Sequence, residues 1–181
     1  MSDAATPLAS DPITEERYRL LSSYAASGVA VVSARAGERD YAATVSAWFS
    51  VSYDPPTMLV SLFELSRIAE AIADSGTWAL SLLNRDQEQV AKWLSSPGAP
   101  VEGLFNQVPH HRGPQTDAAI IDGAIAWFEL RTVDVHLAAT HQLVVGRVLS
   151  QGRPASQGTD VAAASRDPLI HYASRYRRLE R

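Results

Sequence analysis

Two consecutive prolines, Pro55 and Pro56, constrain the fold more than any other feature of the sequence. They stand between residues 42–53 and 57–63, which are rich in the β-branched and aromatic residues that favour strands. Proline has no amide hydrogen, so it cannot donate to the ladder of a central strand. We therefore expect the chain to interrupt its sheet at residues 54–56 and to resume it as a buried strand.

Hydroxyl side chains recur in the stretch before the prolines. Thr44, Ser46, Ser50 and Ser52 are separated by two or four residues, and the two-residue period of a strand would place all four on one face. Buried hydroxyls need polar partners. The pattern leaves two explanations open: water or neighbouring backbone satisfies them, or a bound ligand with many donors and acceptors does.

Composition limits the class of protein. The chain has 181 residues, of which 46% are hydrophobic, enough for one domain with a core of its own. Its net charge is -4 and its only basic block is the final stretch 174–181, so neither nucleic acid nor a membrane surface is expected as a partner. The absence of cysteine excludes thiolate catalysis, iron–sulfur ligation and disulfides. A redox role would therefore need a bound cofactor.

The start of the chain carries no targeting signal. It lacks the basic head and apolar run of a signal peptide, and no stretch of the sequence is long enough to span a membrane. We therefore expect a cytoplasmic protein, with a disordered lead-in over residues 1–12 and a single domain over residues 13–181.

The remaining pattern predicts many short strands and three modest helices. Helices are expected to open at Asp11 or Thr14, at Ser66, which begins an amphipathic run ended by Gly76, and at Asn84. Strands are expected over residues 27–35, 77–84, 125–138 and 141–152, with a last strand or tail over 168–179. This order predicts a mainly β protein with helices (α+β), a β-barrel with helices at its edge.

Residues 97–123 form a long segment without a clear period. They include four prolines and four glycines, and such a segment in a compact domain is more often a functional loop or a subunit contact than idle chain. With Trp93, Leu94, Leu104 and Phe105 it offers apolar surface that a monomer would struggle to cover. We therefore expect a homodimer.

Familiar phosphate motifs are absent, because the chain has neither G-x-G-x-x-G nor a Walker A lysine. Ser66 offers another route, since free amides at a helix start, with Arg67 beside them, can bind an anion. An ordinary N-cap with a surface arginine is the alternative. His110 and His111 lack the partner spacing of a zinc site, so no metal centre is expected. His141 is either an edge residue of its strand or a pocket residue.

Several segments in order resemble the flavin reductase family built on the FMN-binding split barrel: GVAVVSA, TVSAWFSVSYDPPTMLVSL, IADSGTWALSLLNRDQEQVA and HQLVVGRV, then PLIHY and RY. These proteins are the reductase partners of two-component flavin monooxygenases, and the resemblance runs from about Tyr18 to the C-terminus. It implies a split β-barrel and an NAD(P)H:flavin oxidoreductase that transfers hydride from NADH or NADPH to FMN or FAD. The reduced flavin would go to a partner monooxygenase.

The resemblance also implies which residues bind the flavin and the nicotinamide. Thr44, Val45, Ser46 and Ala47 would lie along the isoalloxazine ring, which would satisfy the aligned hydroxyls. The ribityl phosphate would be held by Ser61, Leu62, Phe63, Ser66 and Arg67, and His141 would position the nicotinamide. Two other functions stay open: a flavin-binding electron carrier or sensing module that never oxidises nicotinamide, and a split-barrel interaction protein with an empty site.

Overall fold

The computed structural model describes residues 12–96, 102–153 and 167–179, and the predicted lead-in falls almost entirely outside them. Within these residues, no helix is long and apolar enough to cross a membrane. The helices are α1 (Glu15–Ser22), α2 (Arg67–Ser75) and α3 (Glu88–Leu94). The strands are β1 (Ser27–Gly28), β2 (Ala30–Ala36), β3 (Arg39–Val45), β4 (Trp48–Tyr53), β5 (Pro56–Phe63), β6 (Thr77–Leu82), β7 (His110–Arg112), β8 (Ala119–Ile121), β9 (Ala126–Ala138), β10 (His141–Gly152), β11 (Ile170–Tyr172) and β12 (Arg175–Arg177).

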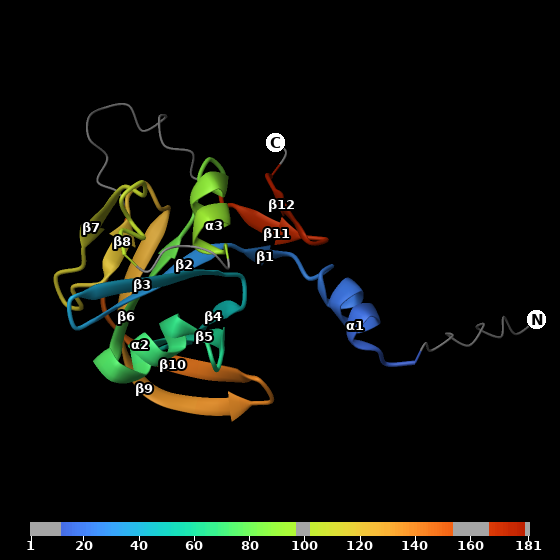
Figure 1. Ribbon diagram of the computed structural model, residues 1–181, viewed down its shortest axis with the longest axis horizontal. Helices are drawn as coiled ribbons and strands as arrows, with labels where there is room; N and C mark the ends of the chain where they lie inside the picture. Colours follow the sequence, from blue (N-terminus) through green and yellow to red (C-terminus); the bar gives the residue numbers. More distant parts are fainter. Residues whose placement is uncertain (1–11, 97–101, 154–166, 180–181) are drawn as a thin grey trace, which may run out of the picture.

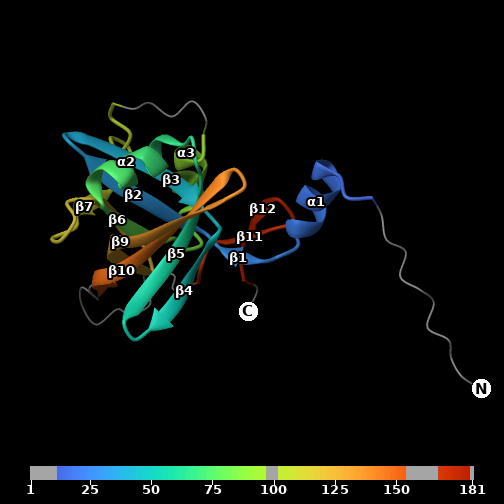
Figure 2. The same cartoon turned by 90° about the horizontal axis from the view of Figure 1, so that it is seen from below.

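Seven strands form one antiparallel sheet in the order β3-β2-β6-β9-β10-β5-β4. The sheet curls, so that β5 crosses over β2 with α2 beside them (Figures 1 and 2). Its edge strands β3 and β4 do not pair with each other in the described part of the chain. The prediction of a mainly β fold with a few helices is confirmed, whereas the described strands do not close into a barrel.

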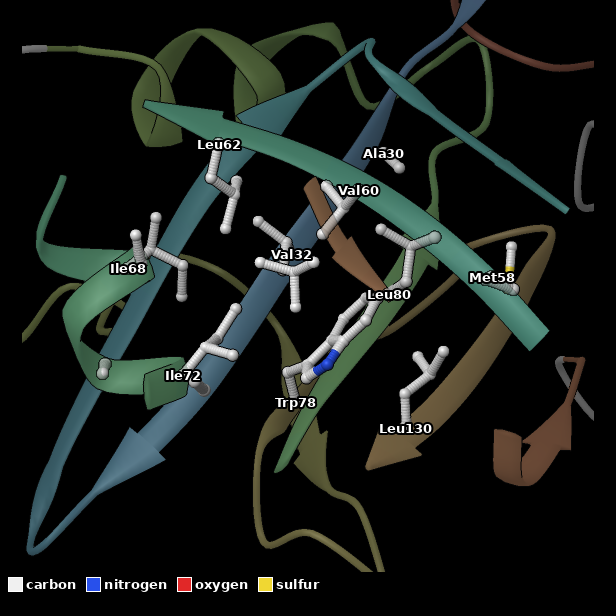
Figure 3. Close-up of a cluster of buried hydrophobic side chains, with 14 residues drawn as sticks. Ala30, Val32, Met58, Val60, Leu62, Ile68, Ile72, Trp78, Leu80 and Leu130 are labelled. Carbon is white, nitrogen blue, oxygen red and sulfur yellow. The ribbon is translucent and has the colours of Figure 1, made fainter. Parts of the chain in front are cut away.

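The first core fills the inside of the curl (Figure 3). It joins strands that are far apart in the sheet order, because side chains of β2 and β5 meet there together with those of α2 and β6. Its largest members are Val32, Met58, Val60, Leu62, Ile68, Ile72, Trp78, Leu80, Leu130 and Val144. We define the inner face of β4, β5, β9 and β10 as the face toward this core, and the outer face as the opposite one.

Helix α2 forms where its local signals predict it. The Ser66 hydroxyl accepts a hydrogen bond from Ala69 N at 3.3 Å, and Gly76 ends the helix with a φ of 67°. Ile68 and Ile72, four residues apart, are buried in the first core. The predicted cap, apolar side and end of this helix are all confirmed.

The double proline occupies a hairpin turn within the sheet. Strands β4 and β5 pair directly on either side of it, with Tyr53 opposite Pro56. The Ser52 hydroxyl belongs to this turn, because it donates to Asp54 O at 3.1 Å. The strand is interrupted at the prolines and resumes as β5, as expected, with Pro55 in the turn and Pro56 as the first residue of β5. The sheet itself continues across the turn, because both flanking strands belong to it.

The prediction that four hydroxyls share one face of a single strand is wrong. Thr44 lies in β3, Ser46 lies in a bend, and Ser50 and Ser52 lie in the next strand, β4. The chain turns at residues 46–47 without a glycine or proline, which is why alternation along the sequence suggested one continuous strand.

A second core lies on the other side of β2 and β6, and part of the long segment 97–123 builds it. Leu94, Leu104 and Phe105 are buried there, and the Trp93 indole donates to Leu104 O at 2.9 Å. The apolar surface assigned to a subunit contact is therefore covered by the chain itself, so this argument for a homodimer is wrong. The described residues of the segment also contain the β7–β8 hairpin.

An ion-pair cluster fastens the β7–β8 hairpin to the β2–β3 hairpin. The Arg112 guanidinium donates to both carboxylate oxygens of Asp40, with Nη2 2.8 Å from Oδ2. Burial of Asp40 acts to raise its pKa, but the hydrogen bond from Arg112 and the charges of Arg112 and Arg35 outweigh this effect. The pKa of Asp40 is therefore below its usual value, because the pair favours the charged carboxylate.

A buried carboxylate holds the loop that follows β7. Glu129 of β9 is fully buried, and its Oε1 accepts hydrogen bonds from Gln115 N at 2.9 Å and from Thr116 N and Oγ1 at 2.8 Å each. Its second oxygen, Oε2, is buried without a partner among the described residues. Three donors on one oxygen fix the loop against the outer face of the sheet.

Candidate active site

The structure brings most of the predicted site residues to one end of the curled sheet. Ser61 N donates to Ala47 O at 2.9 Å, which joins the β3–β4 turn to β5. Ser66 N donates to Phe63 O at 3.0 Å, which joins α2 to the end of the same strand. Phe63 is paired with His141 of β10, and their rings are 5.9 Å apart in an edge-on arrangement. The β3–β4 turn, the end of β5, the start of α2 and His141 are therefore neighbours.

The β3–β4 turn offers peptide groups and one hydroxyl. Ser46 Oγ has no hydrogen-bond partner among the described residues, and Ala47 is exposed. The Val45 side chain packs against the first core. Thr44 is set apart from the turn, because its hydroxyl donates to Ala91 O of α3 at 2.8 Å. Of the predicted Thr44 to Ala47 segment, only the last three residues form the turn itself.

The end of β5 presents alternate residues to opposite faces. Leu62 is buried in the first core, so only its backbone is free to meet a ligand. Ser61 and Phe63 point to the outer face, where Ser61 is half-buried and Phe63 is 47% exposed. The strand therefore offers an aromatic surface and a hydroxyl beside the turn.

The start of α2 combines the N-cap Ser66 with the positively charged side chain of Arg67. The Ser66 hydroxyl donates to Phe63 O at 2.7 Å and accepts from Ala69 N, so it acts as an N-cap. The next two amides, of Arg67 and Ile68, lie in the first helical turn, where no helical carbonyl can accept from them. The exposed Arg67 guanidinium makes no ion pair within the described residues. These groups suit an anion, and that role stays a prediction.

His141 is the first residue of a strand that is paired on both sides. Strand β10 lies between β5 and β9, so His141 marks the end of an internal strand and not a sheet edge. Its Nδ1 is 3.1 Å from Thr140 Oγ1, and Thr140 O accepts a hydrogen bond from Glu64 N at 3.0 Å. The other ring nitrogen, Nε2, has no partner among the described residues and is free for a ligand.

A second histidine lies next to His141 on the outer face. His136 of β9 is paired with Leu143, two residues along β10 from His141, and its Nε2 is 3.1 Å from Asp134 Oδ2. Sequence analysis missed this neighbour because the pairing depends on the length of the β9–β10 turn. Among the described residues, no group of three His, Asp or Glu side chains is placed to hold a metal ion.

Comparison with known proteins places this arrangement in a family. The model of the flavin reductase like domain matches residues 22–180. A probable flavin reductase from Rhizobium meliloti (strain 1021) is 34% identical over 124 residues, 68% of this chain, and the match spans 39% of that relative. The NADH-dependent flavin reductase StyB of Pseudomonas fluorescens is 32% identical over 156 residues, which cover 83% of this chain and 82% of StyB.

A solved structure has the same fold. BorF, the flavin reductase component of a bacterial two-component tryptophan halogenase, superposes with a TM-score of 0.83 at 29% identity. The match covers 93% of this chain and 99% of BorF. The predicted family is confirmed, and the chain belongs to the flavin reductase like domain family.

Proposed function

We propose that this protein is an NAD(P)H:flavin oxidoreductase, which transfers hydride from NADH or NADPH to FMN or FAD and supplies the reduced flavin to a partner monooxygenase. The observation that carries the proposal is the convergence of the β3–β4 turn, the end of β5, the start of α2 and His141, in a chain of this family. We also infer that the curled open sheet is the split barrel of the family.

The residues at this end of the sheet fit a flavin mononucleotide unit. Its ring has a polar pyrimidine edge, and Ser46 Oγ and the Ala47 amide N–H are polar groups without a hydrogen-bond partner in the described residues. Its phosphate is an anion, which suits the first turn of α2 and Arg67. Phe63, nearly half exposed on the outer face, gives an aromatic ring a surface to pack on.

The chain's own residues bind and orient, while the hydride-accepting chemistry comes from the flavin when it is bound. Donors in the β3–β4 turn stabilise negative charge that develops at the pyrimidine edge. Phe63 excludes water from the outer face. His141 has Nδ1 beside Thr140 Oγ1, which fixes its ring and leaves Nε2 to position the nicotinamide.

Anaerobic mixing of the flavin-loaded protein with NADH and with NADPH tests the activity. We expect at least one of them to bleach the flavin absorbance faster than it bleaches free flavin. If neither does, the protein is an electron carrier or a flavin sensor and the reductase proposal fails. If titration neither quenches flavin fluorescence nor colours the protein, it is a split-barrel interaction protein.

Arg67→Ala should weaken flavin binding by about 1–3 kcal/mol, because a charge-assisted hydrogen bond to phosphate is lost. Fluorescence titration with FMN measures the dissociation constant. The matched control is Arg39→Ala, which removes an exposed arginine from β3, the edge strand at the opposite end of the sheet order. Thermal stability should be unchanged in both variants. Equal flavin affinity in Arg67→Ala and the wild type would place the phosphate elsewhere.

We further propose a homodimer, on evidence from α1. This helix buries none of its side chains, and it stands apart from the body of the chain (Figures 1 and 2). Tyr18 and Leu21, one helical turn apart, are 69% and 54% exposed. An amphipathic helix of eight residues is not stable by itself, so its apolar side needs a partner.

The β9–β10 hairpin offers the complementary surface. Val135 and Leu137 lie on the inner face of β9 but beyond the reach of the first core, so both remain exposed. The hairpin tip and α1 project toward the same side of the molecule in Figure 1. A twofold arrangement would let α1 of each copy pack against the hairpin of the other, because an isologous interface uses both surfaces twice.

Leu21→Asp should convert the homodimer to a monomer at micromolar concentration, since it places a charge on the apolar side of α1. The matched control is Arg19→Ala, which lowers the net charge by the same one unit but on the opposite side of α1. Light scattering and sedimentation measure the mass, which is 19.6 kDa for one chain. A monomeric wild type, or equal dissociation of both variants, would contradict this interface.

A further inference from the structure

One row of side chains on the outer face of the sheet concentrates positive charge. Arg147 of β10 is paired with Thr57 of β5 on one side and with Arg131 of β9 on the other, and Arg131 is paired with Thr77 of β6. Directly opposed residues in antiparallel strands point to the same face. We call these four residues the arginine rung.

The two arginines of the rung have no counter-charge in the described chain. Both are exposed, and neither forms an ion pair or hydrogen bond with a described side chain. The two carboxylates on this face of β9 already have other partners. Glu129 accepts hydrogen bonds from the Gln115 and Thr116 amides, and Asp134 is paired with His136. Like charges directly opposite each other on neighbouring strands destabilise a sheet. An external anion would remove that cost.

The rung lies on the same face as the candidate active site. Alternate residues of β10 from His141 to Arg147 share the outer face, and the half-buried Leu143 and Val145 lie between them. Arg147 is six positions beyond His141 along the strand, which corresponds to a distance of roughly 20 Å. A ligand that reached both would be elongated and would carry its negative charge far from the ring at His141.

We propose that the arginine rung binds a phosphoryl group of a nicotinamide dinucleotide, either the 2′-phosphate of NADPH or the pyrophosphate of NADH or NADPH. Guanidinium groups bind phosphate oxygens through pairs of parallel hydrogen bonds. The Thr77 hydroxyl adds a neutral donor beside Arg131, whereas the Thr57 hydroxyl already donates to Pro55 O at 2.9 Å. This inference rests on the proposed function, because it assigns a binding site to part of the nicotinamide dinucleotide that the reductase would oxidise.

The test is equilibrium binding to the full chain by calorimetry, with NAD⁺, NADP⁺, FAD, FMN and inorganic pyrophosphate as probes. Removal of two charge-assisted contacts in the double variant Arg131→Ala, Arg147→Ala should weaken binding of at least one nicotinamide dinucleotide on the order of tenfold to a hundredfold. Loss for NADP⁺ alone identifies the 2′-phosphate, and equal loss for NAD⁺ and NADP⁺ identifies their pyrophosphate. The affinities for FMN and FAD should be unchanged, because the FMN phosphate, which is also part of the FAD pyrophosphate, is assigned to the start of α2.

Three controls make the result decisive. Arg39→Ala should bind every probe as the wild type does, and pyrophosphate should raise the thermal midpoint of the wild type but not of the double variant. The midpoint of the double variant without ligand should not fall, because a like-charge pair has been removed. Unchanged affinity for both NAD⁺ and NADP⁺, or an equal loss for FMN, would overturn the proposal. Failure of the wild type to oxidise NADH and NADPH would reject the proposed function, whereas binding of NAD⁺ and NADP⁺ is measured without turnover and would still decide the role of the rung.

Discussion

Glu129→Ala should lower the free energy of unfolding by about 3–5 kcal/mol, the largest effect on stability that we expect from a single substitution in this chain. The fully buried carboxylate accepts from Gln115 N, Thr116 N and the Thr116 hydroxyl. Alanine would remove the charged acceptor of three partly buried hydrogen bonds, and a hydrogen bond to a charged group contributes about 1.5–3 kcal/mol. The loop also passes so close that a side chain at Gly113 would collide with the Glu129 carboxylate.

Urea unfolding followed by circular dichroism measures this loss. Glu129→Gln is the informative companion, because the amide oxygen can still accept while the charge is absent, and its loss should be clearly smaller. Glu70→Ala, on the exposed side of α2, is the control for removing a glutamate from the surface and should change stability by less than about 0.5 kcal/mol. A loss below about 1 kcal/mol in Glu129→Ala would mean that the loop is held by other contacts.

His141→Ala should lower kcat/KM for NADH or NADPH on the order of tenfold to a hundredfold and leave flavin affinity nearly intact. The physical reason is that positioning of the nicotinamide is removed without loss of a proton transfer. His141 Nε2 is free among the described contacts, and the ring lies edge-on to Phe63. His136→Ala, on the same face but bound to Asp134, is the matched control and should keep most of the activity.

Flavin dissociation constants and hydride-transfer rates, measured on the same His141→Ala sample, separate three outcomes. Lower kcat/KM with unchanged flavin affinity supports a positioning role for His141. Wild-type rates at saturating flavin and subsaturating NADH would reject that role. Lost flavin binding would show that His141 supports the flavin site itself, through its pairing with Phe63.

The sequence predicted those elements whose signals are local. Helix α2 carries its cap at Ser66, its end at Gly76 and its apolar side within eleven consecutive residues, so no distant contact was needed to recognise it. The long β9–β10 hairpin was equally recognisable from its two apolar runs. The family resemblance then grouped the segments that converge on the candidate site, where Ala47, Ser61, Phe63, Ser66 and His141 are indeed neighbours.

The sequence did not predict features that depend on distant partners. Leu104 and Phe105 suggested a subunit contact, yet they pack into a core whose other walls are β2 and α3. Glu129 alternates with its neighbours as an exposed strand residue would, and only the loop that passes over it makes it buried. The arginine rung requires the register of four strands, and β-bulges in β9–β10 shift that register. None of these facts has a local signal.

Strand β2 belongs to both cores, because Val32 and Ala34 enter the first core while Val31, one residue before Val32, enters the second. A strand that is covered on both sides cannot detach from one core without disturbing the other. The two cores therefore form a single cooperative unit, and neither can open while the other persists. Ligand bound at the start of α2 would for this reason also protect the β7–β8 hairpin from transient opening and proteolysis, although the two elements lie on opposite sides of the sheet.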